Sequence, residues 1–248
     1  MSQNPKAQAW DALGLKYYFL GRRSAKPSPS TVRWFTAGVG PDGRCLVVGG
    51  TSVGVIRAAA RSGCPVVVAD FSPRVCADLR QELSGAVTIV QRDVLQPVPD
   101  WDGGFTHLLC DALVNRFDDE EARRFERQAA RVLRPGGVLR ATVQLGLYPM
   151  ELRLMEMAPG EIQGFWDERT RTIDYGRIGD LLERAIAPHG DISRQDLLEW
   201  YRHRGREKRF DEKDLCDLFG PPAWAPVEVA PDDPASDRVR LAARRTDR

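Results

Sequence analysis

The sequence predicts an α/β domain in which helices cover both faces of a mostly parallel, doubly wound sheet. Between residues 44 and 145, short apolar runs alternate with helical stretches, which is typical of parallel strands joined by right-handed crossovers. Near the end of the chain, two further strands separated by the loop PDDPASD predict a hairpin. We therefore expect one antiparallel terminal strand at an edge of the sheet.

The predicted strands are short apolar runs bounded by turn residues. Cys45–Val48 and Val66–Ala69 are continuously apolar, as expected for strands that are buried on both faces. The other strands are expected at Ala86–Val90, Phe105–Cys110, Val138–Leu145, Val227–Ala230 and Val239–Ala243.

Helices are expected where apolar residues recur at helical spacing or where a capping residue precedes such a segment. They are predicted at Ser52–Arg61, at Ser72–Leu83 and at Glu212–Leu218. Another helix is expected to begin at the acidic cluster Asp118–Glu121, because carboxylates are favoured at a helix N-terminus. The sequence Arg134-Pro-Gly-Gly137 is expected to end that helix.

The regions outside this alternating core are predicted to be helical. Residues 1–43 contain the helical stretch Ala9–Leu20 and a short helix at Thr31–Thr36, and we expect them to form an N-terminal cap. Residues 44–248 form the main domain, in which residues 146–210, rich in arginine and large aromatics, are a helical insertion.

Composition excludes several classes of protein. The 248 residues carry a formal net charge of +1, so no overall charge favours nucleic acid or a membrane surface. We expect no transmembrane helix and no signal peptide, because apolar stretches are too short. Five scattered cysteines without a C-x-x-C pair support neither a disulfide framework nor a metal site, and a reducing cytoplasm is the expected setting.

A glycine turn followed by an acidic residue is the strongest functional signal. Gly49 and Gly50 follow the first strand, and Asp70 ends the second strand 21 residues beyond Gly49. An acidic group near this spacing binds the ribose hydroxyls of a nucleoside cofactor. The alternative interpretations are a tight turn without a ligand and, for Asp70, a helix cap. We expect an adenosine-containing cofactor.

Four short segments resemble class I S-adenosylmethionine-dependent methyltransferases. They are the glycine turn VVGGTSVG, the ribose acid in VADFS, QRDV after the third strand and VLRPGGVL before the fifth. The resemblance covers about Arg44 to Leu145 and implies a Rossmann-like sheet. The turn departs from the family pattern, which has a second glycine at the position of Thr51 and a small residue then glycine at Ser52-Val53.

The resemblance implies S-adenosylmethionine as the cofactor and a small molecule as the methyl acceptor. The residues expected at the cofactor are Gly49, Gly50, Thr51, Asp70, Phe71, Ser72, Asp93, Val94, Asp111 and Ala112. Candidates on the acceptor side are Tyr18, Asn115 and His203. No catalytic residue is assigned, because transfer from a sulfonium depends mainly on holding acceptor and methyl close and aligned.

Alternatives remain open at this point. Asp93 could instead be the carboxylate of a turn, and Asp111 a cap at the surface. The basic run Arg202–Arg209, which contains His203, could be a solvent-exposed face. That run could also meet a carboxylate or phosphate of the substrate; nucleic acid is disfavoured because the whole chain is not basic. The same fold could catalyse another reaction of the sulfonium, such as cyclisation of the aminobutyrate arm. A nicotinamide oxidoreductase lacks its Tyr-x-x-x-Lys pair here, and a scaffold is the remaining possibility.

Overall fold

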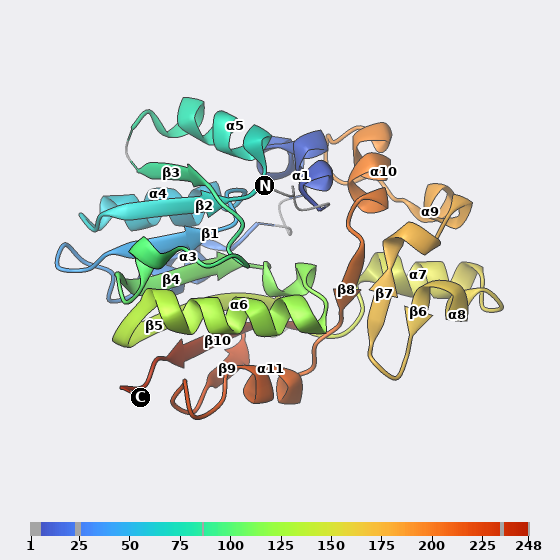
Figure 1. Ribbon diagram of the computed structural model, residues 1–248. Coiled ribbons are helices and arrows are strands. Elements are labelled where there is room, and N and C mark those ends of the chain that lie inside the picture. Colours follow the sequence, from blue (N-terminus) through green and yellow to red (C-terminus); the bar gives the residue numbers. More distant parts are fainter. Residues whose placement is uncertain (1–5, 23–25, 86, 234–235, 248) are drawn as a thin grey trace.

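A seven-stranded sheet forms the centre of the computed structural model, which describes residues 6–22, 26–85, 87–233 and 236–247 (Figure 1). The strand order is β3-β2-β1-β4-β5-β10-β9. The strands are β1 Cys45–Val48, β2 Val66–Asp70, β3 Thr88–Gln91, β4 Phe105–Asp111, β5 Leu133–Gln144, β9 Glu228–Pro231 and β10 Arg238–Arg244. β1 to β5 pair in parallel, whereas β10 is antiparallel to β5 and to β9. The predicted fold class is confirmed.

The antiparallel strand lies one position in from the edge, so the predicted edge position was wrong. β10 pairs with β5 from Arg238 to Arg244 and buries Val239, Leu241 and Ala243. β9 takes the edge instead, and it ends at Pro231, a residue that cannot donate a hydrogen bond to a further strand. The more apolar strand is therefore the one that is enclosed.

Helices cover both faces of the sheet, as predicted. One face packs against α3 Pro29–Thr36, α4 Val53–Arg61 and α5 Pro73–Leu83, and the other against α6 Asp119–Val132 and α11 Glu212–Leu218. Local caps explain two of these starts, since the Ser72 hydroxyl accepts from Val75 N and Asp118 forms a capping box with Glu121.

Three predicted boundaries differ from the structure. The stretch Ala9–Leu20 is two helices, α1 Ala7–Leu13 and α2 Lys16–Leu20, because Gly14 has a φ of +53° that ends the first. Ala86, where the third strand was predicted to begin, lies outside the described residues. Residues 134–137 do more than end α6: they bulge out of β5, since Phe105 pairs with Leu133 but His107 pairs with Val138.

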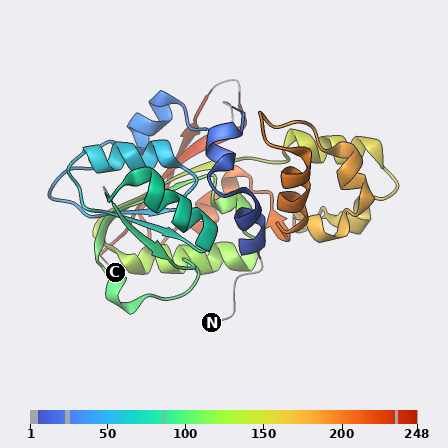
Figure 2. The ribbon, with the colours of Figure 1, turned by 90° about the horizontal axis from the view of Figure 1, so that it is seen from above.

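Residues 146–210 combine helices with a second sheet that was not predicted. The helices are α7 Pro149–Met157, α8 Ile162–Phe165, α9 Asp180–Ala185 and α10 Arg194–Arg202, and the sheet is β6 Trp166–Asp167, β7 Thr172–Asp174 and β8 Arg206–Lys208. Figure 2 shows this region beside the main sheet, with α1 between them. Ala9 and Leu13 of α1 belong to the apolar core of this region. The division into cap, main domain and insertion stays a prediction.

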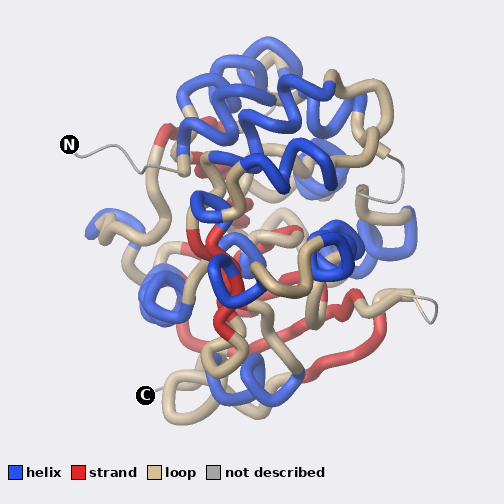
Figure 3. Tube along the Cα trace, turned by 90° about the vertical axis from the view of Figure 1, so that its right-hand side faces the viewer, coloured by secondary structure: helices blue, strands red, loops and turns tan. Residues whose placement is uncertain are grey.

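The end of the sheet where β1, β2 and β4 finish faces these helices. Figure 3, seen from the side of residues 146–210, shows helices and loops in front of that end.

Within the described ranges, no helix has both the length and the apolar character required to cross a membrane.

Candidate functional site

A cavity of about 1130 Å³, partly open to solvent, lies at the carboxyl ends of β1, β2 and β4. This edge of an open α/β sheet is where ligands bind. We name it the sheet-edge cavity. It brings together most of the residues predicted from the sequence, namely Tyr18, Gly49, Thr51, Asp70, Phe71, Asp93, Val94, Asp111 and Ala112.

The two glycines of the turn are required for different reasons. Gly49 has a φ of +88°, a backbone conformation that side chains disfavour, and it lines the cavity. Gly50 does not line the cavity. A Cβ at Gly50 would lie 2.5 Å from Leu79 Cδ1 and 2.6 Å from Val75 Cγ1, so glycine is needed there for packing against α5.

Asp70 is held by the turn and by the start of α5. Its Oδ2 accepts from Gly50 N at 2.7 Å, and its Oδ1 accepts from Ser72 N at 2.8 Å. A carboxylate has about four acceptor positions, so two remain for a ligand. Burial raises the pKa of Asp70 to about 6, although these two N–H groups oppose the rise. The helix-cap interpretation of Asp70 is wrong, because Ser72 is the N-cap of α5. The ribose interpretation stays a prediction.

Ser72 supports Asp70 from outside the cavity. Its hydroxyl donates to Asp11 Oδ1 at 2.6 Å and accepts from Val75 N at 3.0 Å, and the residue is fully buried. Because Asp11 belongs to α1, this contact also ties the N-terminal helix to the second strand. Ser72 holds the site in place and does not line it.

The loop after β3 supplies one wall of the cavity. Asp93 Oδ1 accepts from Leu95 N at 3.0 Å, which makes the turn that the sequence offered as the alternative interpretation. The same residue nevertheless lines the cavity, together with Phe71 and the nearly buried Val94. An apolar wall beside an acidic group suits a flat nitrogenous base.

The end of β4 is fixed by a polar cluster. Asp111 accepts from Ser52 Oγ at 3.1 Å and from Thr142 Oγ1 at 2.5 Å, and it forms an ion pair with Arg238. Ala112 follows with a φ of +50°, and its N–H donates to Thr142 Oγ1 at 3.0 Å. A non-glycine residue in this conformation is strained, and such strain is concentrated at functional sites.

Two tyrosines of α2 cover the cavity. The space above Gly54 is taken by Tyr18, whose Oη would be 3.2 Å from a Cβ at that glycine. Lys26 Nζ lies 5.2 Å from the centre of the Tyr18 ring. Burial raises the pKa of Tyr17 to about 12, against the opposing effect of Arg116. The Tyr17 hydroxyl therefore stays protonated at neutral pH and cannot serve as a base.

Two predicted acceptor-side residues are not brought to the cavity. Asn115 is fully buried, and its side chain donates to Gln144 O at 2.7 Å and accepts from Gln144 N at 2.9 Å. Its amide is used to complete the end of β5. His203 ends α10, where its Nδ1 lies 2.9 Å from Glu199 O, and it lines none of the cavities described here.

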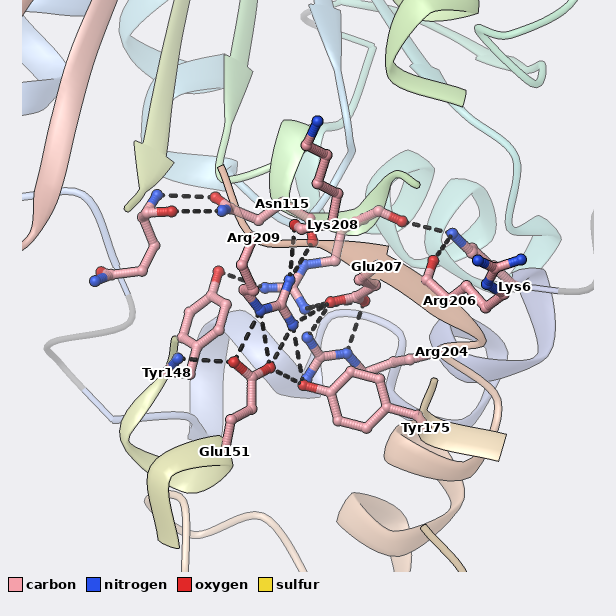
Figure 4. Close-up of polar contacts among 12 residues, drawn as sticks. Lys6, Asn115, Tyr148, Glu151, Tyr175, Arg204, Arg206, Glu207, Lys208 and Arg209 are labelled. Carbon is pink, nitrogen blue, oxygen red and sulfur yellow. Dashed lines mark hydrogen bonds and ion pairs between the residues drawn. The ribbon is translucent and has the colours of Figure 1, made fainter. Parts of the chain in front are cut away.

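A buried ionic network lies beside the cavity and was not predicted (Figure 4). Glu207 is bonded by Arg204 Nε at 2.8 Å, by Arg209 Nη2 at 2.9 Å and by Arg116 Nη1 at 3.3 Å. Arg209 Nε also donates to Glu151 Oε2 at 2.8 Å. The basic run is therefore not a solvated face at these positions.

The sequence held little signal for this network. Arg116, Arg204 and Glu207 line the sheet-edge cavity, yet no local spacing relates Arg116 to residues some ninety positions later. Burial would raise the pKa of Glu207, but Arg116, Arg204 and Arg209 outweigh it and hold that pKa well below its usual range. Glu207 is thus ionised at any physiological pH.

Comparison with known proteins decides the family. Residues 46–137 match the model of a family described as a methyltransferase domain, and these residues hold the glycine turn, Asp70 and Asp93. The chain therefore contains a methyltransferase domain with the fold of the class I S-adenosylmethionine-dependent methyltransferases. No curated protein matches the sequence.

Solved structures share the fold of this methyltransferase. A Burkholderia thailandensis 1,6-didemethyltoxoflavin-N1-methyltransferase with bound S-adenosylhomocysteine has a TM-score of 0.60 and 14% identity, covering 100% of this chain and 92% of its own. A Methanosarcina mazei S-adenosylmethionine-dependent methyltransferase has a TM-score of 0.58 and 15% identity, covering 89% and 99%. At such identities the likeness shows the fold alone.

A more similar structure has a different description. A Rhodobacter sphaeroides protein, described provisionally as a Zn-dependent alcohol dehydrogenase, has a TM-score of 0.91 and 35% identity over 98% of this chain and 99% of its own. In the part of our methyltransferase that the structure describes, no group of three or more His, Cys, Asp or Glu side chains could hold a metal ion. The antiparallel β10 also differs from the strand order 3-2-1-4-5-6 of dinucleotide-binding folds.

The residues present fit S-adenosylmethionine, the cofactor of this family. Asp70 keeps free acceptor positions for a sugar diol, and Phe71 and Val94 provide an apolar wall. Gly49 leaves the backbone of the turn uncovered for an amino-acid tail.

Proposed function

We propose that this methyltransferase transfers the methyl group to a small-molecule acceptor, with the cofactor in the sheet-edge cavity. The observation that carries the proposal is the convergence of Gly49, Asp70, Asp93 and Ala112 on one cavity at the carboxyl edge of the sheet. A second cavity, lined in part by helices of residues 146–210, shares four lining residues with it. An acceptor enclosed there is a small molecule and not a nucleic acid or a membrane.

Each residue has a distinct role in this proposal. Asp70 accepts from the ribose hydroxyls, while Gly50 and Ser72 hold its carboxylate in place. Phe71, Asp93 and Val94 form the adenine end. Four other lining residues, Gly49, Thr51, Asp111 and Ala112, are the proposed neighbours of the methionine end.

The protein positions the reactants and excludes water. The bound cofactor would supply an activated methyl carbon, and the residues named above would hold it beside the acceptor. Tyr17, Arg116, Ala112 and Arg204 line both cavities and so lie where the two reactants would meet. Burial raises the pKa of Tyr17 to about 12, and a guanidinium group offers N–H donors and no acceptor, so these side chains orient the acceptor and do not deprotonate it.

Calorimetry with S-adenosylmethionine, S-adenosylhomocysteine and NADH tests the cofactor. We expect the two sulfur nucleosides to bind at micromolar concentration and NADH to bind far more weakly; tight NADH binding would contradict the proposal. Product analysis then separates the reactions, because methyl transfer yields S-adenosylhomocysteine whereas attack at the aminobutyrate arm yields methylthioadenosine.

All five cysteines are free thiols, and we keep the reducing cytoplasm as the proposed setting.

A further inference from the structure

The second cavity, named here the insertion cavity, has a volume of about 1500 Å³ including its opening to solvent. Its walls come largely from α7, α10 and the loop after α9, and it shares four lining residues with the sheet-edge cavity. A molecule in this cavity is therefore adjacent to one in the other. The next step rests on the proposed function: in a methyltransferase, the cavity next to the cofactor site is the place for the acceptor.

The charged residues that line the insertion cavity all have the same sign. Five arginines line it, and its described lining contains no aspartate or glutamate. They are Arg22, Arg116, Arg153, Arg204 and Arg238. A concave site lined by one sign of charge concentrates ligands of the opposite sign.

Carboxylates elsewhere compensate these arginines only in part. Three guanidinium groups, of the buried Arg204 and Arg209 and the partly exposed Arg116, face two carboxylates, of Glu151 and Glu207. One positive charge is left over among these five groups. An anion in the cavity would supply the missing charge.

Two other arginines of the lining, Arg22 and Arg153, are exposed to solvent. Within the described part of the chain, neither forms an ion pair with a carboxylate. Arg22 donates to the Pro188 carbonyl. Both are therefore available to an incoming anion.

Aromatic rings form the rest of the wall, and one of them has an unused donor. Trp200 is 4% exposed, and its buried indole Nε1 has no hydrogen-bond partner among the described residues. A buried indole N–H normally finds an acceptor. Tyr17 lies 5.3 Å from Trp200 between ring centres, and Tyr201 lies 4.8 Å from it. At such separations the rings pack against one another and form an aromatic wall, against which an aromatic ligand can pack.

We propose that the acceptor is a planar aromatic acid, whose ring packs against the wall of Tyr17, Trp200 and Tyr201 and whose carboxylate is bound by the arginines of the insertion cavity. The indole N–H of Trp200 is the hydrogen-bond donor that the apo protein leaves for it.

Matched acids and amides test this proposal on the full chain saturated with S-adenosylhomocysteine. The probes are benzoate and its hydroxy and amino derivatives, each compared with the corresponding benzamide by calorimetry. We expect the best acid to bind at least about tenfold more tightly than its amide, because only the acid forms charge-assisted hydrogen bonds. Equal affinities, or no acid binding up to about 10 mM, would overturn the proposal.

Single substitutions assign the effect to the cavity. Arg153→Gln and Arg22→Gln should each weaken acid binding about threefold to tenfold and leave amide binding unchanged. Trp200→Phe keeps a ring and removes the donor, and should weaken acid binding by about fivefold. Arg177→Gln, an exposed residue of the same region, is the matched control and should change neither.

Binding of S-adenosylhomocysteine separates the possible failures. If the nucleoside binds but acids are not preferred, the acceptor proposal fails alone. If the wild-type protein does not bind the nucleoside, the proposed function fails with it. A Trp200→Phe variant whose nucleoside affinity also falls would show a general structural effect and would contradict a specific role for its N–H.

Discussion

The two cavities of this methyltransferase differ in charge although they share a wall. The charges that line the sheet-edge cavity are balanced, with five cationic side chains and five carboxylates. The cations are Lys6, Lys26, Arg92, Arg116 and Arg204, and the carboxylates are Asp70, Asp93, Asp111, Glu121 and Glu207. The described lining of the insertion cavity has five arginines and no carboxylate. A balanced wall suits a cofactor that carries both signs of charge, whereas a cationic wall selects an anionic partner.

The cavities also differ in how they are built. The sheet-edge cavity is formed by turns that directly follow β1, β2 and β4, so its residues are placed by local structure. The insertion cavity gathers residues from α2, η3 (Val114–Arg116), α7 and α10, which meet only in the folded chain. The ionic network of Glu151 and Glu207 joins these distant segments.

The largest effect is expected from breaking that network. Glu151→Gln would leave Arg209 with less compensation in a fully buried place, and the free energy of unfolding should fall by about 3–5 kcal/mol. Urea denaturation measures this free energy of unfolding. The exposed Glu168→Gln is the control, with a change within about 0.5 kcal/mol. Wild-type stability in Glu151→Gln would mean that the network does not join the two regions.

The next effect separates the functions of the two cavities. Asp70→Ala removes the proposed acceptor of the ribose hydroxyls and should weaken S-adenosylhomocysteine binding by about 2 kcal/mol, roughly thirtyfold. Asp42→Ala, an exposed residue before the amino end of β1, should leave the affinity unchanged. Calorimetry measures the affinity of each variant for S-adenosylhomocysteine. Equal affinity of Asp70→Ala and wild type would remove Asp70 from the cofactor site.

A third substitution tests why the turn needs its second glycine. Gly50→Ala would force the new Cβ against Val75 and Leu79, and should lower the free energy of unfolding by about 1–3 kcal/mol. Gly160→Ala has open space and is the control. Loss of cofactor affinity without loss of stability would instead indicate that Gly50 contacts the ligand.

The smallest effect is a pH dependence. Folding raises the pKa of Asp70 from 3.8 to about 6, so its contribution to stability is complete below 3.8 and is lost as pH rises through about 6. Cofactor binding should change in the opposite direction, because the ionised form accepts from the ribose. Affinity should increase by up to about tenfold per pH unit between pH 5 and 6 and then level off. Asp70→Asn should abolish this dependence, and its persistence there would assign it to another group.

The sequence predicted the parts of the molecule that depend on neighbouring residues. The apolar run Cys45–Val48 is β1, and the helix beginning near Ser72 and the acidic start of α6 lie where they were expected. Each depends on a few residues close together. The glycine turn and Asp70 could be found for the same reason.

Long-range pairing could not be predicted. Asn115 is polar and follows β4, as a ligand-binding residue would, but the end of β5 takes its amide. Arg209 belongs to a strongly basic run, but Glu151, 58 positions earlier, makes its burial possible. No local pattern indicates which charges will meet, so the insertion cavity emerges only in the folded protein.

A crystal structure of the methyltransferase with S-adenosylhomocysteine tests the division between the two cavities most directly. We expect both ribose hydroxyls on the Asp70 carboxylate, the adenine beside Phe71 and Val94, and the sulfur directed at the shared wall of Tyr17 and Ala112. A nucleoside bound among the arginines of the insertion cavity, with Asp70 making no ligand contact, would contradict the account.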